Sequence, residues 1–391
     1  MILNTPSKAL ADLSTIKWNE MKILQTVKYY EPSKGGMESV VKDIVNGVSQ
    51  IDEKVAFTVY SNHHHSNPRR EIVQRGANVI IKEKTALFFK SQPLHFTYPS
   101  LKKLIGGHDL VHHHYPFPNM ELALLRNLDA LSRKRFIVTW HANVESTRWS
   151  WIKSYYNPLV GKLLDRAESI AVTSPQLYEA STLLRDYEKK VRVIPLSFNP
   201  MFEETLEMGQ KKYPRDRTFS LLFVGKLRKY KGVEFLVKAI ESLDVRLTIV
   251  GSGEEELPLK QMVEAMGIEA KVLFLSNIGN EQLVGIYKSS DLFVLPSISE
   301  AEAFGVVQLE AMASGLPVVN TRLNSGVPFV SMNEVTGLTV PPGDIEALRG
   351  AISRIQEHPA LFEHFSKNAI ERAREFTGEK MAAAYLDLYR K

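Results

Sequence analysis

The stretch PSISEAEAFGVVQLEAMASGLPVV, residues 296–319, carries the strongest structural signal in this sequence. An apolar run ends at Pro296, a polar turn follows, and a helical pattern begins near Gly305. A strand joined to a helix in this way is the unit of an α/β fold with a parallel sheet. The first amides of such a helix lack intrahelical partners, and the helix dipole favours negative charge beside them. The stretch therefore predicts an α/β domain with an anion-binding turn at the carboxyl edge of its sheet.

The same alternation of short apolar runs and amphipathic segments extends along nearly the whole chain in two series. Between the series, the residues VIPLSFNP at 193–200 lead into a polar stretch that reaches Arg217, which predicts a domain linker. Each series predicts a doubly wound parallel sheet. The expected strands are residues 23–27, 54–60, 110–111, 136–140 and 169–173 in the first series, and 220–224, 246–250, 271–275, 292–295 and 317–320 in the second.

The length of 391 residues also favours two domains rather than one. A final helix has apolar residues at helical spacing and is expected to cross back and pack against the first domain. These residues are Met381, Tyr385 and Leu388. The expected organisation is a leader at 1–20, a first Rossmann-like domain at 21–198, a second at 199–372, and the final helix at 373–391.

The composition excludes several classes of site. The chain has no cysteine, so disulfides, thiolate nucleophiles and cysteine-ligated metals are excluded. The net charge of +5 favours anionic partners, which include phosphates, nucleic acid and acidic lipid. Because no recognition helix, aromatic RNA-binding pattern or zinc pattern is present, we expect no nucleic-acid partner.

The sequence predicts a cytoplasmic protein. No apolar run approaches the roughly 20 residues of a membrane-spanning helix, and the N-terminus lacks the pattern of a secretory signal. Two aromatic and basic stretches, 87–103 and 148–162, have the composition of surfaces that rest on anionic lipid, although packing in the core explains them as well. A peripheral contact with the inner face of the cytoplasmic membrane therefore stays open.

Two glutamates flank the anion-binding turn. Glu302 precedes the turn and Glu310 lies on the helix, so both carboxylates can surround one crevice at the sheet edge. The amides of Gly305, Val306 and Val307 can donate to a diphosphate there, and Gly305 allows a close approach. Taken alone, the two glutamates are better explained as solvated charges beside an ordinary turn.

A cationic turn follows the strand at 220–224. The residues FVGKLRKYKG at 223–232 place Lys226 and Lys231 after Gly225, where positive charge can neutralise a departing diphosphate. Surface lysine clusters are also commonly just solvated, so this motif depends on the first one for its interpretation.

Two further candidates lie in the first domain. Gly35 and Gly36 follow the opening strand and permit a tight turn whose amides face a ligand, although a plain strand-to-helix loop is the alternative. His141, in the residues TWHAN at 139–143, ends another expected strand. A lone histidine is often structural, but this position at a strand end favours a functional role.

The histidine triplets 63–65 and 112–114 suggest a metal site at first sight. Consecutive residues of an extended chain point to opposite faces, so one cation cannot easily use all three. We therefore interpret the first triplet as a surface loop and the second as a strand end. The turn Gly251-Ser252-Gly253 lacks the third glycine of a dinucleotide fingerprint, which disfavours a dehydrogenase.

These motifs, in this order, resemble family 4 of the retaining glycosyltransferases, and the resemblance runs from Met21 to the C-terminus. Residues 302–310 match the ExFGxxxxE signature, and EAMASGLPVV is the usual continuation. The resemblance implies the GT-B fold, in which two Rossmann-like domains face a central cleft that the donor spans. It also implies a metal-independent mechanism, since no DxD triplet is present, and no cofactor beyond the nucleotide diphosphate sugar substrate.

The resemblance assigns a role to each motif residue. Glu302 would hold hydroxyls of the donor sugar, Glu310 the nucleotide ribose, and Lys231 the departing diphosphate. The family has arginine at the position of Lys226, so a point charge replaces a bidentate fork there. The resemblance also implies that Asn277 and Ile278 contact the base and that His141 contacts the transferred sugar. His114, counted from Asp109, resembles the DxxxxH position and would face the acceptor. The remaining residues implied to contact the donor are Gly35, Gly36, Gly225, Phe304, Gly305, Val306 and Val307, and the ring of Phe304 is expected to pack the turn.

The expected activity is transfer of a hexose from GDP-mannose, ahead of UDP-sugars, to a glycan or undecaprenyl-diphosphate-linked acceptor. The segments SGVPFV and TGLTVPPGD resemble enzymes that assemble O-antigen or capsule chains. No carboxylate near His141 is an evident nucleophile, so we expect the acceptor to attack on the face that the diphosphate leaves. The alternatives are a UDP-sugar transferase, a hydrolysing epimerase, and a non-catalytic nucleotide-sugar-binding component of an assembly complex.

Overall fold

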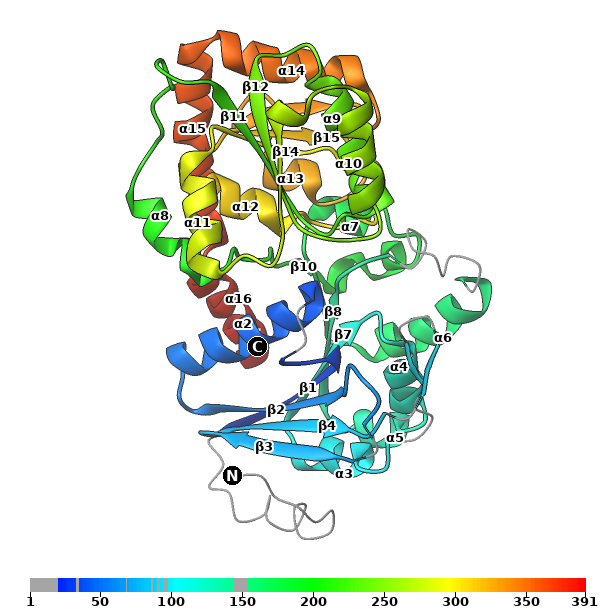
Figure 1. Ribbon diagram of the computed structural model, residues 1–391. Helices are drawn as coiled ribbons and strands as arrows, with labels where there is room; N and C mark the ends of the chain where they lie inside the picture. The colour runs from blue at the N-terminus through cyan, green and yellow to red at the C-terminus, as the bar shows by residue number, and fades with distance from the viewer. Residues whose placement is uncertain are drawn as a thin grey trace. The chain divides into compact units, whose positions relative to one another are not determined.

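The computed structural model describes residues 20–32, 35–67, 69–85, 87–89, 92–94, 98–143 and 153–391, and the chain divides into two α/β units (Figure 1). The chain passes from the first unit to the second between Ile194 and Pro195, close to the expected boundary at 198/199, and returns at Met381. The expected leader lies outside the described residues except for Glu20. The first unit comprises Met1–Thr173, Ser181–Ile194 and Met381–Lys391, and the second comprises Ser174–Ala180 and Pro195–Lys380.

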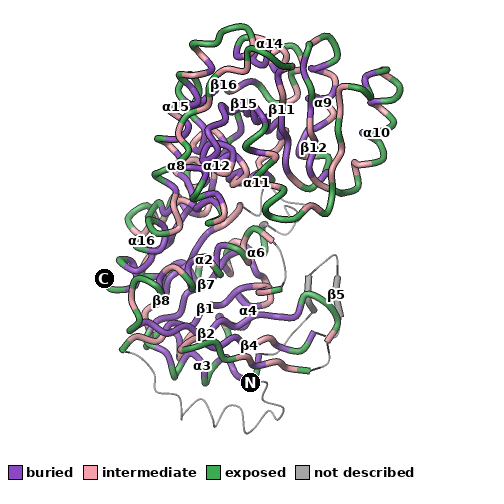
Figure 2. The backbone as a smooth tube through the Cα atoms, turned by 60° about the vertical axis from the view of Figure 1, so that its left-hand side comes forward, coloured by how far each residue is buried: buried purple, intermediate pink, exposed green. Residues whose placement is uncertain are grey.

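The first unit is built on an eight-stranded sheet with the order β10-β9-β8-β7-β1-β2-β4-β3. Neighbouring strands are parallel except β3 and β4, which form an antiparallel pair at the edge. Strands β2 and β7 are buried over their whole length (Figure 2). The strands are β1 (Met21–Tyr29), β2 (Val55–Asn62), β3 (Glu71–Arg75), β4 (Asn78–Glu83), β7 (Leu110–Tyr115), β8 (Arg135–Trp140), β9 (Ser169–Val172) and β10 (Val191–Val193), and β5 (Leu87–Phe89) and β6 (Gln92–Leu94) pair separately.

The second unit is built on a six-stranded, wholly parallel sheet with the order β13-β12-β11-β14-β15-β16. Its central strand β14 is completely buried, as its continuous apolar run predicts for a parallel sheet covered on both faces. The strands are β11 (Phe219–Val224), β12 (Val245–Val250), β13 (Val272–Leu275), β14 (Leu292–Leu295), β15 (Val318–Thr321) and β16 (Gly337–Val340).

Helices connect the strands in both units, so the two parallel α/β sheets expected from the sequence are confirmed. All the expected strands are present, whereas β3, β4, β5, β6, β10 and β16 were not expected. The helices are α2 (Gly36–Ile51), α3 (Leu101–Gly107), α4 (Pro118–Leu125), α5 (Leu128–Leu131), α6 (Lys153–Arg166), α7 (Pro175–Glu179), α8 (Glu203–Glu207), α9 (Val233–Ala239), α10 (Glu256–Ala265), α11 (Asn280–Ser289), α12 (Val306–Ala313), α13 (Val327–Val330), α14 (Ile345–Glu357), α15 (Pro359–Ala373) and α16 (Gly378–Arg390).

The last helix, α16, supplies its final turns to the core of the first unit. The apolar stripe of Met381, Tyr385 and Leu388 is buried, as the helical spacing predicts. The phenol of Tyr389 lies against the ring of Phe57 in β2, with ring centroids 6.1 Å apart. A helix from the end of the chain therefore completes the first α/β unit.

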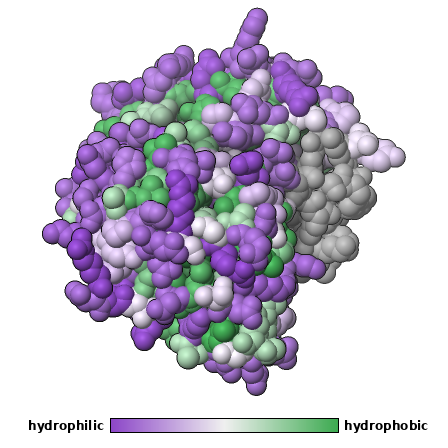
Figure 3. Space-filling view, turned by 90° about the horizontal axis from the view of Figure 1, so that it is seen from above, coloured by the Kyte–Doolittle hydropathy of each residue, from purple (hydrophilic) through white to green (hydrophobic). Residues whose placement is uncertain are grey.

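On the face shown in Figure 3 the surface is mostly hydrophilic, with hydrophobic residues among the hydrophilic ones. Within the described part of the chain, every helix is too short or too polar to cross a bilayer. The two stretches proposed to rest on lipid fall partly outside the described residues, and that contact stays a prediction.

Candidate functional site

The turn between β14 and α12 has the geometry that its sequence predicts. Gly305 caps the helix in the left-handed conformation, with φ 74° and ψ 55°. A Cβ atom at this position would lie 2.8 Å from Nε2 of Gln308 and 2.9 Å from Cδ2 of Leu295. Only glycine fits here without strain, because both the dihedral angles and the space exclude a side chain. The first turn of α12 begins with the half-buried Val306 and Val307, whose amides have no intrahelical carbonyl to bind.

The side chain of Gln308 anchors this helix inside the unit. Its Oε1 accepts a hydrogen bond of 2.9 Å from Nδ2 of Asn320 in β15, and its Nε2 donates to the carbonyl of Val327 at 3.3 Å. All three residues are buried. The amide end of α12 is therefore held in a fixed position before any anion arrives, which is what an anion site requires.

Glu302 and Lys231 form a buried ion pair. A carboxylate oxygen of Glu302 contacts Nζ of Lys231 and also accepts a hydrogen bond of 3.1 Å from the hydroxyl of Ser297. The side chain of Glu302 is 10% exposed and that of Lys231 is 9% exposed. Two motifs that lie about 70 residues apart in the sequence thus meet at one point of the second unit.

Backbone contacts bring the two turns together. Gly232, which follows Lys231, has φ 63°, and a Cβ atom there would lie 2.2 Å from the carbonyl oxygen of Pro296. The amide of Ile298 donates to the carbonyl of Tyr230 at 2.8 Å. Gly232 therefore permits the turn that carries Lys231 to approach the turn that carries Glu302, and this close approach brings the two side chains into contact.

Lys226 occupies a different environment from Lys231. Its side chain is exposed, one residue after Gly225, whose amide donates to the carbonyl of Val250 at 2.9 Å. A Cβ atom at Gly251 would lie 1.9 Å from the carbonyl oxygen of Gly225, so this glycine permits close packing of the β11 and β12 loops. Lys226 is exposed, and its role as a point charge beside the diphosphate stays a prediction.

Glu310 lies on α12 and is held by Tyr287 of α11, a residue that no sequence motif indicated. The hydroxyl of Tyr287 donates to the carboxylate of Glu310 at 2.9 Å. Burial raises the pKa of Glu310 to about 7, and the hydrogen bond from Tyr287 opposes that shift. Near neutral pH this carboxyl group therefore exists in both protonation states in the unliganded protein.

Substitution of Glu310 by glutamine tests this environment through stability. Because the folded-state pKa lies above the ordinary value of 4.5, folding binds a proton between pH 4.5 and about 7, and the ionised group costs stability above that range. We expect Glu310→Gln to remove this cost, so that its stability relative to the unaltered protein rises by up to roughly 3 kcal/mol between pH 5 and pH 8. Urea unfolding followed by circular dichroism at both pH values measures this difference, and a difference that is independent of pH would contradict it.

Three further residues of the second unit, Phe304, Asn277 and Ile278, are predicted to contact the donor, and their environments differ. The ring of Phe304 is buried and packs beside Phe329 and Phe376, with centroids 6.5 and 6.4 Å away, so it packs the turn as expected. Asn277 is exposed in the left-handed region with φ 54°, and Ile278 beside it is half-buried; both follow β13. The contribution of these three residues to donor binding stays a prediction.

His141 follows β8 in the first unit and is half-buried. Its backbone amide donates to the carbonyl of Tyr115 at 3.0 Å, and its Nε2 lies 2.9 Å from Nδ1 of His114, with the two rings stacked. Burial lowers the pKa of His141 to about 3, so the ring is neutral at physiological pH. A neutral imidazole can accept a hydrogen bond from a sugar hydroxyl through its unprotonated nitrogen.

The second histidine triplet lies at the end of β7, directly before its last residue Tyr115, so the strand extends beyond the expected residues 110–111. All of β7 is buried, and Tyr389 of α16 hydrogen-bonds to His112 on one of its faces. The expected alternation of faces is confirmed: His112 and His114 are neighbours with ring centroids 4.3 Å apart, while His113 bonds to Thr26 and Glu121 on the other side. Of the first triplet, His64 and His65 are exposed as expected, but His63 is buried. Over the described residues, neither triplet joins a group of three side chains suited to hold a metal ion.

The glycine pair begins α2. Gly35 is the N-cap, and the helix starts at Gly36. A Cβ atom at Gly35 would lie 2.2 Å from a carboxylate oxygen of Glu38, whereas the same atom at Gly36 would meet open space. The backbone at Gly36 is therefore open to a ligand, whereas the space at Gly35 is occupied by Glu38.

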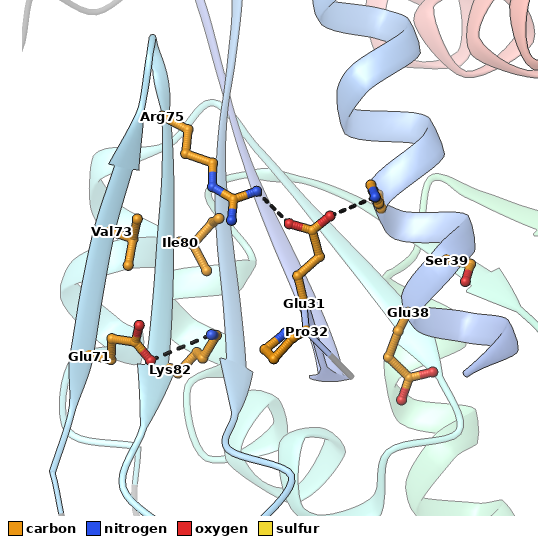
Figure 4. Close-up of a pocket in the computed structure, with 10 residues that line it drawn as sticks. Glu31, Pro32, Glu38, Ser39, Glu71, Val73, Arg75, Ile80 and Lys82 are labelled. Carbon is orange, nitrogen blue, oxygen red and sulfur yellow. Dashed lines mark hydrogen bonds and ion pairs between the residues drawn. The ribbon is translucent and has the colours of Figure 1, made fainter. Parts of the chain in front are cut away.

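A pocket of about 520 Å³ lies beside this turn, between α2 and the edge strands β3 and β4 (Figure 4). Glu31 reaches across it to Arg75 and forms a second ion pair with Lys42 at 2.8 Å, while Glu71 pairs with Lys82 at 3.4 Å. Five of the charged residues that line the pocket, Glu31, Lys42, Glu71, Arg75 and Lys82, are thus paired with one another. No sequence pattern indicated this pocket, because β3 and β4 were not expected.

Comparison with known proteins identifies relatives for both units. The family model described as Glycosyltransferase Family 4 matches residues 34–200, and the one described as Glycosyl transferases group 1 matches residues 207–372. The D-rhamnosyltransferase WbpZ of Pseudomonas aeruginosa is 29% identical over 365 residues, covering 91% of this chain and 92% of its own. The O-antigen chain mannosyltransferase C of Escherichia coli is 26% identical over 376 residues, covering 94% and 98%.

Solved structures with the same fold include glycosyltransferases. The sucrose-phosphate synthase from Thermosynechococcus elongatus superposes with a TM-score of 0.73 at 23% identity, covering 95% of this chain and 98% of its own. Anabaena Alr3699/HepE in complex with UDP superposes with a TM-score of 0.69 at 19% identity, covering 95% and 100%. At this level of identity the likeness shows the fold, which is GT-B as the sequence predicts.

Proposed function

Because the chain belongs to the family 4 glycosyltransferases, we propose that it transfers a mannosyl unit from GDP-mannose to a glycan or undecaprenyl-diphosphate-linked acceptor in O-antigen synthesis. The observation that carries this proposal is the buried pair of Lys231 and Glu302, set beside the amide end of α12. A cation and free amides suit a diphosphate, while a fixed carboxylate suits the hydroxyls of a sugar.

Each residue then has a chemical task. The amides of Val306 and Val307 and the ammonium of Lys231 hold the diphosphate. Glu302 accepts hydrogen bonds from hydroxyls of the mannosyl ring, and Glu310 accepts them from the ribose. His141 accepts a hydrogen bond from another hydroxyl of the transferred sugar through its unprotonated nitrogen.

The transfer exchanges one bond at the anomeric carbon. The bond from this carbon to the diphosphate oxygen breaks, and the acceptor oxygen forms its bond on the same face, with net retention. The hydroxyl proton of the acceptor passes to the departing phosphate oxygen. Lys231 and the helix amides stabilise the negative charge that develops on the diphosphate. Mass-spectrometric detection of a covalent glycosyl-enzyme would replace this route by a two-step one.

Different observations support the proposed identity of the donor sugar and that of the nucleotide base. The names of two relatives give mannose and D-rhamnose, and D-rhamnose has the manno configuration of mannose without its 6-hydroxyl group. The similarity of both relatives over nearly the whole chain favours a manno-configured donor. One structural neighbour is a complex with UDP, which keeps a UDP-sugar as the second candidate.

A donor screen tests the proposal. We expect release of GDP from GDP-mannose in the presence of a lipid-linked glycan acceptor, and slow release without one. Release of UDP only would reject the donor, and rapid release without any acceptor would indicate a hydrolysing epimerase. Tight donor binding with no release in any mixture would indicate a non-catalytic binding component.

A further inference from the structure

A continuous path of buried hydrogen bonds runs from His141 to helix α16 within the first unit. The path, named here the histidine network, joins side chains from β1, β7, β8 and α16. Its bonds are His141 Nε2 to His114 Nδ1 (2.9 Å), His114 Nε2 to Gln25 Oε1 (2.7 Å), Gln25 Nε2 to the Tyr389 hydroxyl (2.9 Å), the Tyr389 hydroxyl to His112 Nδ1 (2.8 Å), His112 Nε2 to Thr139 Oγ1 (2.7 Å), and Thr139 Oγ1 to the Tyr385 hydroxyl (3.0 Å).

Every member of the histidine network except His141 itself is fully buried. A polar group in such surroundings costs free energy unless it is hydrogen-bonded, so each donor is expected to meet an acceptor. Burial lowers the pKa of His112 and His114 well below the usual value. The three imidazoles are therefore neutral, and each has one donor nitrogen and one acceptor nitrogen.

The amide oxygen of Gln25 decides which ring nitrogen carries the proton in His114 and in His141. The amide oxygen of Gln25 can only accept, so the hydrogen bond to it must come from Nε2–H of His114. The other nitrogen of His114, Nδ1, is then an acceptor, and Nε2 of His141 must donate to it. This leaves Nδ1 of His141 as the nitrogen with the free lone pair.

The amide of Gln25 is oriented with its oxygen toward His114 and its nitrogen toward Tyr389. The amide nitrogen of Gln25 donates to the hydroxyl of Tyr389, whose own proton is then directed to Nδ1 of His112. The side chain of Gln25 is thereby held at both ends, by His114 and by Tyr389. Without the phenol oxygen the amide nitrogen loses its acceptor, and rotation of the amide would reverse the proton positions on His114 and His141.

We propose that Gln25 and Tyr389 are positioning residues that hold His141 in its Nε2–H tautomer, with Nδ1 kept as the acceptor for a hydroxyl of the transferred sugar. The catalytic part of this inference rests on the proposed function, whereas the tautomer itself does not. It gives the final turns of α16 a task in the chemistry beyond packing. A tautomer fixed in advance spares the ring a proton rearrangement when the donor binds.

Two tyrosine-to-phenylalanine variants separate this role from simple packing. Tyr389 and Tyr385 lie one turn apart on α16 and are both fully buried, but the hydrogen bond to Gln25 comes from Tyr389, whereas Tyr385 bonds to Thr139. Nitrogen-15 NMR of the histidine rings, with His141 assigned by its loss in a His141→Asn variant, reports the tautomer without substrate. We expect a single Nε2–H tautomer in the unaltered protein and in Tyr385→Phe, and a mixture of tautomers in Tyr389→Phe. The value of kcat/KM is expected to fall about five- to tenfold in Tyr389→Phe only.

Each outcome decides the proposal. An Nδ1–H tautomer in the unaltered protein, or an unchanged tautomer in Tyr389→Phe, overturns it, and so does a mixed tautomer with unchanged kcat/KM. If Tyr389→Phe does not fold, Gln25→Met removes the amide that bonds to both His114 and Tyr389, and it is also expected to give a mixture of tautomers. Failure of the unaltered protein to use any donor would sink the proposed function, while the NMR comparison would still decide the tautomer.

Discussion

Glu302→Gln is expected to lower the rate of sugar transfer by about 100- to 1000-fold while the protein stays folded. The carboxylate is held by Lys231 and Ser297 and is therefore fixed before the donor arrives. Glutamine keeps the size and an acceptor for Lys231, but it loses the charge that strengthens hydrogen bonds from the sugar as positive charge develops at the anomeric carbon. Nucleotide release measures the rate, and circular dichroism checks the fold.

A matched control for this substitution lies in the same turn. Glu300 is half-buried two residues away, and we assign it no contact with the donor. Glu300→Gln is expected to retain nearly the full rate. Wild-type turnover by Glu302→Gln, or equal losses in both variants, would remove Glu302 from the donor site.

Lys231→Met is expected to affect both stability and activity. It leaves the carboxylate of Glu302 buried without its partner, which typically costs about 3–5 kcal/mol. It also removes the charge that stabilises the departing diphosphate, so transfer should fall about 100-fold or more. The double variant Lys231→Met/Glu302→Gln removes both charges, and should regain most of the stability but none of the activity.

The measurement of stability must follow the second unit. All tryptophans of the chain lie before residue 152, so tryptophan fluorescence reports only on the first unit. Urea unfolding is therefore followed by circular dichroism. The exposed Lys229 of the same turn gives the control, since Lys229→Met should change stability by less than about 0.5 kcal/mol. Equal effects of the Lys229 and Lys231 variants would contradict a special role of the buried pair.

The parts of the fold that the sequence predicts are those with uninterrupted apolar runs. Strands such as β11 and β14 are buried on both faces, so their residues are apolar at nearly every position and stand out. The edge strands β3 and β10 are short and partly exposed, and their mixed composition carries no such signal. The hairpin of β3 and β4 was missed for this reason, and the pocket beside it was missed as well.

The sequence predicts which motifs form the candidate site, but it does not predict the long-range hydrogen bonds that hold their side chains. The positions of Glu302, Gly305 and Lys231 follow from local patterns, because a strand-to-helix turn is recognisable in a short window. The hydrogen bond from Tyr287 to Glu310 joins two helices and has no local signature. The same holds for Tyr389, which lies 277 residues from its partner His112 in the sequence.

A crystal structure with GDP bound tests the central claim most directly. We predict that the β-phosphate lies within hydrogen-bond distance of the amides of Val306 and Val307 and of Nζ of Lys231, with the ribose against Glu310. Nucleotide bound elsewhere on the second unit, with Glu310 facing away from the ribose and Lys231 still paired only with Glu302, would contradict it.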